Sequence, residues 1–150
     1  LRDEVAAAEK RLGRPLTFLV GKPGLDGHSN GAEQIAVRAR DSGIEVVYEG
    51  IRLTPEEIVA AALQESVHVV GLSILSGSHL PLITEIMDRM NEAGIGDIPV
   101  VVGGIIPADD ADALRKAGVA AVYTPKDFDL SAIMEDIVGI IDAATPAAAE

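Results

Sequence analysis

The sequence contains no cysteine and no tryptophan, and it has only two tyrosines and two phenylalanines. Without cysteine the chain has neither disulfide bonds nor thiolate metal ligands, which is compatible with a cytoplasmic location. The scarcity of aromatic residues argues against a stacking platform for nucleic-acid bases. The apolar runs are also short, and none approaches the roughly 20 residues that a membrane-spanning helix needs.

Basic residues are few: 12 Lys and Arg stand against 24 Asp and Glu, which gives a net charge of −12. Such a chain is a poor partner for nucleic acid or for an anionic membrane. Hydrophobic residues nevertheless make up 48% of the 150 residues, so we expect one folded domain with its own core. The N-terminal LRDEVAAAEKRLGRP lacks the apolar segment of a signal peptide. Because the chain begins with Leu instead of Met, we expect a fragment of a longer protein, and the absence of cysteine leads us to expect a cytoplasmic one.

Five short apolar runs predict buried parallel strands. They lack polar alternation, as expected where helices cover both faces of a sheet. The predicted strands are Leu16–Val20, Glu45–Tyr48, Val67–Ser73, Ile98–Val102 and Ala120–Tyr123.

Helical segments with clear end signals alternate with these strands. Thr54 and Glu57 form a capping box around Pro55, which takes the first helical position. The predicted helices cover residues 31–42, 55–64, 80–93, 107–116 and 130–142, and a further helix lies within residues 1–14.

This order predicts an α/β fold, a doubly wound five-stranded parallel sheet in the flavodoxin-like order 2-1-3-4-5 with helices on both faces. Residues 15–142 would form the domain, 1–14 a helix or linker from a preceding domain, and 143–150 a disordered tail. Ligands of such folds bind outside the carboxyl ends of the strands. Function is therefore expected in the loops after residues 21, 73, 102 and 123.

The first loop, GKPGLDGHSNG at residues 21–31, matches neither a Walker A loop nor a G-x-G-x-x-G motif. It places Asp26 two residues before His28. The carboxylate can accept a hydrogen bond from one ring nitrogen and leave the other as a lone-pair donor to a metal. One histidine cannot hold a free ion, but it can serve as an axial ligand to a metal in a macrocycle. The alternative interpretation is a plain exposed turn.

The second loop is rich in hydroxyls. Ser73 ends a predicted strand and can donate to a polar ligand, whereas Ser76 and Ser78 are equally well explained as helix caps. Receiver domains of response regulators share the expected architecture, but they need a phosphorylatable Asp where Ser73 stands. His68 is predicted to be a satisfied core or sheet-end histidine, and the role of His79 stays open.

The third and fourth loops carry weaker signals. Gly103 and Gly104 allow a flat or bulky ligand to approach the backbone closely, or they make a simple tight turn. Tyr123 and Thr124 begin a segment that is compatible with a turn alone.

Together, Asp26-x-His28-x-x-Gly31, Ser73-x-Leu75 and Gly103-Gly104 resemble the three-part signature of cobalamin-binding domains in which a histidine replaces the cofactor's own base. The resemblance covers about residues 15–142. It implies that His28 binds cobalt from the lower face, that Asp26 accepts a hydrogen bond from His28, and that Lys22 extends this chain.

The resemblance also implies that the nucleotide tail of cobalamin inserts between sheet and helices, lined by Ser73 and Leu75, with room provided by Gly103 and Gly104. The implied cofactor-binding residues are Asp26, Gly27, His28, Ser29, Asn30, Gly31, Ser73, Leu75, Ser76, Gly103, Gly104, Tyr123 and Thr124.

In the stretches Val20–Gly31 and Tyr48–Arg52 the sequence is most similar to acyl-CoA carbon-skeleton mutases of the ethylmalonyl-CoA type, with the methylmalonyl-CoA type as runner-up. This resemblance implies adenosylcobalamin as cofactor and an acyl-CoA-binding barrel domain as partner, and it allows a homodimer of the full enzyme. The domain alone is not expected to be catalytic. A corrinoid methyl-carrier module and a cobalamin sensor are the alternatives.

Overall fold

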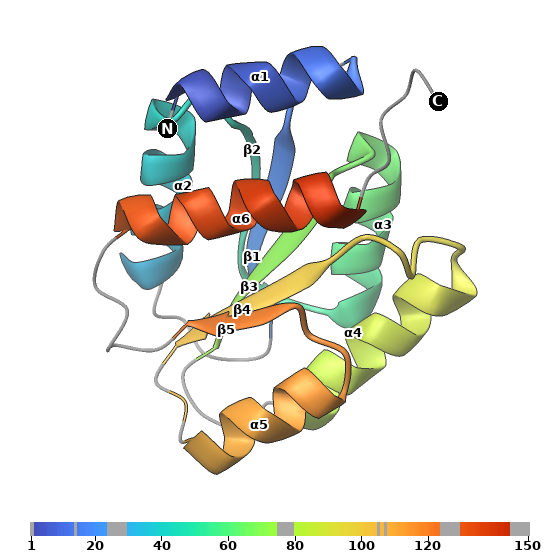
Figure 1. Cartoon of the computed structure of the whole chain (residues 1–150). Coiled ribbons are helices and arrows are strands. Elements are labelled where there is room, and N and C mark those ends of the chain that lie inside the picture. The colour runs from blue at the N-terminus through green and yellow to red at the C-terminus, as the bar shows by residue number, and fades with distance from the viewer. Residues whose placement is uncertain are drawn as a thin grey trace.

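The computed structural model describes residues 2–13, 15–23, 30–74, 80–104, 106, 108–123 and 130–144. Within these ranges helices and strands alternate along the chain (Figure 1). The helices are α1 (Arg2–Leu12), α2 (Asn30–Asp41), α3 (Pro55–Glu65), α4 (Leu80–Glu92), α5 (Ala108–Lys116) and α6 (Leu130–Ala144). The strands are β1 (Thr17–Pro23), β2 (Glu45–Leu53), β3 (Val69–Ile74), β4 (Val100–Gly104) and β5 (Ala121–Tyr123).

The five strands form one sheet in the order β2-β1-β3-β4-β5, and every neighbouring pair is parallel. The predicted α/β class and strand order are therefore confirmed. No helix in these ranges is long and apolar enough to cross a membrane.

Helices cover both faces of the sheet, because successive side chains of a buried strand point to opposite faces. Phe18, Val69 and Val101 pack with α1, α2 and α6, and we call this side the α6 face. Leu19 and Val70 pack with α3, α4 and α5 on the opposite side, the α4 face. Each strand thus contributes to two separate apolar cores, which explains the continuous apolar runs in the sequence.

Two strands are longer than predicted. β1 continues through Gly21–Pro23, and β2 continues to Leu53 instead of ending at Tyr48. The β1–β2 register shifts twice here, since Gly21 pairs with Gly50 and Pro23 with Leu53. The additional β2 residues make bulges, and they bring polar and glycine residues that interrupt the apolar pattern.

Helix ends follow the predicted capping rules. The Thr54 hydroxyl accepts a hydrogen bond from the Glu57 amide at 3.2 Å, and the Glu57 carboxylate accepts one from the Thr54 amide at 2.9 Å. Pro55 occupies the first turn, and Ser66 ends α3 in the left-handed region. α6 runs to Ala144, two residues beyond the predicted helix end.

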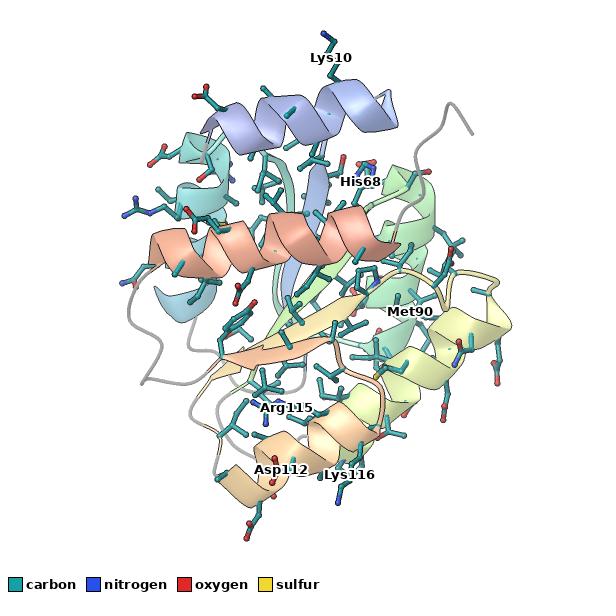
Figure 2. All side chains as sticks on the ribbon, in the orientation of Figure 1. Lys10, His68, Met90, Asp112, Arg115 and Lys116 are labelled. Carbon is teal, nitrogen blue, oxygen red and sulfur yellow. The ribbon has the colours of Figure 1, made fainter. Side chains whose placement is uncertain are left out.

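His68 lies at the amino-terminal edge of the sheet, next to α1 (Figure 2). Its Nδ1 accepts a hydrogen bond from the buried Thr17 amide at 3.1 Å, and its own amide donates to the Thr17 carbonyl at 2.9 Å. In the adjoining turn, the Glu9 carboxylate of α1 accepts from the Leu16 amide at 2.8 Å. His68 is therefore the satisfied sheet-end histidine that the sequence predicts.

Candidate functional site

Four strands deliver the predicted loops to one edge of the sheet. Because the strands are parallel, their carboxyl ends meet there: Pro23 of β1, Ile74 of β3, Gly104 of β4 and Tyr123 of β5. These ends gather at the lower left of Figure 1. β1 lies between β2 and β3, so the chain leaves β1 toward one side and later returns on the other, which is the switch point where such folds bind ligands.

Three of the predicted site residues form a row across this edge. Ser73 of β3 pairs with Gly103 of β4, and Gly103 pairs with Tyr123 of β5. Paired residues of parallel strands point to the same face, and Tyr123 packs against the core of the α6 face. The row Ser73–Gly103–Tyr123, which we call the edge row, therefore faces α6. All three residues are half-buried.

Gly103 leaves the centre of the edge row without a side chain. A Cβ atom at this position would lie 3.8 Å from the Tyr123 carbonyl oxygen and 4.0 Å from its Cβ, both ordinary contacts. Among the described residues, no atom fills the place of a side chain here, so a flat ligand could lie directly against the backbone. A ligand that inserts between the sheet and α6 is therefore compatible with this position.

Gly104 differs from its neighbour, because it alternates to the other face. A Cβ atom there would collide with the Ile74 carbonyl, and the φ angle of Gly104 is +155°. The close approach of β4 to β3 therefore accounts for glycine at this position without a ligand.

The remaining predicted residues belong to the first loop and to the beginnings of the second and fourth loops, directly after β3 and β5. Lys22 is part of β1, and Asn30 and Gly31 begin α2. The structure thus brings both ends of the Asp-x-His segment to the carboxyl edge, next to the edge row. Residues that lie outside the described ranges are Asp26, Gly27, His28, Ser29, Leu75, Ser76 and Thr124.

Two further residues lie on the α6 face short of this edge, and the sequence analysis does not predict them as site residues. Gly71 lies two positions before Ser73 on the same face of β3, and a Cβ atom there would collide with the ring of Phe18. Phe18 is 1% exposed. A glycine inside an apolar strand signals a close approach, but the sequence does not say which residue approaches it.

The chain matches a known domain family and proteins that contain it. The family described as the B12 binding domain matches residues 16–143. Ethylmalonyl-CoA mutase of Cereibacter sphaeroides is 65% identical over 99% of this chain, which spans 22% of that relative's length. The small subunit of 2-hydroxyisobutanoyl-CoA mutase from Aquincola tertiaricarbonis is 42% identical over 86% of this chain and 94% of its own.

Among solved structures, a cobalamin-binding protein from Desulfitobacterium hafniense has the same fold. It superposes with a TM-score of 0.71 at 19% identity and covers 96% of this chain and 70% of that one. The family match covers all five strands, the helices from α2 onward and the whole of the first loop, and the chain therefore belongs to the B12-binding domain family.

Proposed function

We propose that this chain binds adenosylcobalamin in its base-off form, with His28 as the lower axial ligand of cobalt. The observation that carries the proposal is the B12-binding family match over residues 16–143, in which Asp26-x-His28 falls between β1 and α2 at the switch point of the sheet. In this proposal the domain comprises residues 2–144, because Val5 and Ala8 of α1 pack into the core of the α6 face and α6 ends at Ala144, and the residues after 144 form a tail.

Asp26 is proposed to act through His28. Its carboxylate accepts a hydrogen bond from one imidazole nitrogen, so that the other presents its lone pair to cobalt. Lys22 belongs to β1, and we propose that it extends this chain of contacts to Asp26. Asp26 and Lys22 together would therefore fix the tautomer and the orientation of the His28 imidazole.

The edge row supplies a surface for the displaced nucleotide tail. Gly103 exposes its backbone on the α6 face, Ser73 beside it brings a hydroxyl, and Tyr123 flanks it on β5. A flat aromatic base can lie on such a surface, because no side chain at Gly103 stands in its way. Leu75, Ser76 and Thr124 follow the strand ends and are proposed to complete the surface.

We further propose that the domain serves a radical acyl-CoA mutase of the ethylmalonyl-CoA/methylsuccinyl-CoA type. The support is the 65% identity to an ethylmalonyl-CoA mutase, of which this chain corresponds to 22%. Adenosylcobalamin, when bound, would supply radical chemistry through its cobalt–carbon bond, and the protein would hold and shield the cofactor. Substrate binding belongs to a separate barrel domain, so this chain alone is not catalytic.

The test is a titration of the purified chain with adenosylcobalamin or hydroxocobalamin, followed by the visible spectrum. The expected result is a base-off, histidine-ligated spectrum that is lost in His28→Ala and retained in His79→Ala, a control at another histidine. Retention of this spectrum in His28→Ala would overturn the ligand assignment. Absence of binding in a wild-type chain with native circular dichroism would contradict cobalamin binding by the domain.

The substrate is tested separately. The chain is combined in turn with the barrel domain of an ethylmalonyl-CoA mutase and with that of a methylmalonyl-CoA mutase, and turnover of each barrel's own substrate is measured. The chain is expected to support turnover with the ethylmalonyl-CoA barrel and to support little with the other. Better support of the methylmalonyl-CoA barrel would reject the assignment to the ethylmalonyl-CoA type and leave the cofactor assignment intact.

A further inference from the structure

A buried aromatic ring lies on the α6 face, just short of the edge row. Phe18 of β1 pairs with Val69 of β3, yet its ring lies over Gly71, two residues nearer to the carboxyl edge. The far end of the ring, Cε1 and Cζ, occupies the place of a Gly71 Cβ atom, so the ring leans along the strands toward the edge row. It can do so because Gly71 has no Cβ atom.

The ring is fixed in place by the core around it. Phe18 is 1% exposed and belongs to the same apolar cluster as Val20, Val101 and Met134 of α6. Cores are packed as tightly as organic crystals, so a ring in such a cluster gives way little. On the α6 face of β3, Ser73 is the next position beyond the ring toward the edge.

We propose that Phe18 is a specificity-determining residue that limits how far an aromatic base can insert between the sheet and α6. This inference rests on the proposed cobalamin binding. A base that enters at the carboxyl edge passes Ser73 and Gly103 and then meets the Phe18 ring over Gly71. Two aromatic rings can meet there with favourable edge-to-face geometry, but a longer base would clash.

The test compares cobamides whose lower bases differ in length. Dissociation constants are measured for cobalamin, which carries dimethylbenzimidazole, for a cobamide with the longer naphthimidazole base, and for cobinamide, which lacks the nucleotide tail. The wild-type chain is expected to bind the naphthimidazole form more weakly than cobalamin. Phe18→Leu shortens the side chain. We expect it to lower the dissociation constant of the naphthimidazole cobamide, relative to that of cobalamin, by roughly tenfold.

A matched control separates this effect from lost stability. Leu19 is adjacent to Phe18 and fully buried, but it packs on the α4 face. Leu19→Ala is expected to lower the midpoint of unfolding and to leave the ratio between the two bases unchanged. An equal shift in both variants would overturn the role of Phe18.

The opposite change tests the same contact. Gly71→Ala places a Cβ atom where the Phe18 ring lies, so the ring must move. We expect this variant to bind cobalamin more weakly and cobinamide as well as the wild type does. In the double variant that also carries Phe18→Leu, we expect the affinity for cobalamin to be restored. If neither substitution changes the affinity for cobalamin, the role of Phe18 is rejected and the proposed function is unaffected. If the wild-type chain binds no cobamide at all, the proposed function itself is rejected.

Discussion

At the scale of single residues, Gly103 and Gly104 stand side by side but face different surroundings. Among the described residues, Gly103 has only Tyr123 near its missing Cβ on the α6 face, whereas Gly104 lies against the Ile74 carbonyl. One glycine thus leaves space that a ligand can use, and the other allows two strands to approach.

This difference predicts separate effects of two adjacent substitutions. Gly104→Ala is expected to lower the free energy of unfolding by about 1–3 kcal/mol, because backbone must shift to admit the methyl group. Gly103→Ala should change it by less than about 0.5 kcal/mol and should weaken cobalamin binding. Urea denaturation and a cobalamin titration of both variants check this, and a strongly destabilised Gly103→Ala would contradict it.

His68 provides a residue-scale prediction at the other edge of the sheet. Its Nδ1 accepts from the Thr17 amide, and both residues are buried. His68→Leu leaves that amide without this acceptor and should cost roughly 1–3 kcal/mol. His68→Asn places an oxygen near the position of Nδ1 and should recover part of the loss.

Chemical denaturation of the two His68 variants measures these losses, and cobalamin binding serves as the control. Because His68 lies at the opposite edge from the candidate site, both variants should bind cobalamin like the wild type. Equal stability of His68→Leu and His68→Asn would show that the hydrogen bond contributes little.

At the scale of helices and strands, the local chemistry of an end decides whether the sequence can predict it. Thr54 and Glu57 form their capping box within four residues, and the structure confirms it. The end of β2 is different, because Glu49 and Gly50 interrupt the apolar run while the strand continues to Leu53. Pairing with β1 decides that end, and pairing with a distant strand leaves no local signal.

The candidate site, too, is predicted by the sequence only in part. Ser73, Gly103 and Tyr123 can each be named from their places after predicted strands. Their alignment in one row depends on the register of β3, β4 and β5, which only the structure supplies. The contact between Phe18 and Gly71 escapes prediction for the same reason, since it joins two strands across the sheet.

Replacing either of two helix-associated glycines by alanine is expected to change the stability of the fold, in opposite directions. A Cβ atom added at Gly139 inside α6 or at Gly94 beyond α4 would meet none of the described residues within 4 Å, but Gly94 has a φ of +81°. Gly139→Ala should stabilise the fold by roughly 0.5–1 kcal/mol, since alanine loses less backbone entropy in a helix. Gly94→Ala should destabilise it by about 1 kcal/mol, because a side chain is strained at positive φ. The midpoints of thermal unfolding of both variants check these signs. If Gly94→Ala stabilises the fold, the strain expected from the positive φ angle at this position is contradicted.

At the scale of the whole molecule, one sheet serves two cores and one ligand edge. The α6 and α4 faces share every strand from β1 to β5, so neither core can open without disturbing the other. A mutase small subunit matches this chain over 94% of its own length, so in that relative this domain forms almost a whole chain. We therefore expect the domain to unfold as one cooperative unit.

Cooperative unfolding turns ligand binding into a global measurement. A ligand that binds only the folded state adds RT ln(1 + [L]/Kd), about 2.7 kcal/mol at a free concentration of 100 Kd. For a domain of 150 residues this corresponds to a rise in Tm of about 5–10 °C. Adenosylcobalamin is expected to produce this rise in the wild-type chain and a clearly smaller one in His28→Ala, because the proposed bond from His28 to cobalt would contribute only in the folded domain. If both chains respond equally, the tail and corrin contacts at the carboxyl edge carry the binding energy, and His28 does not.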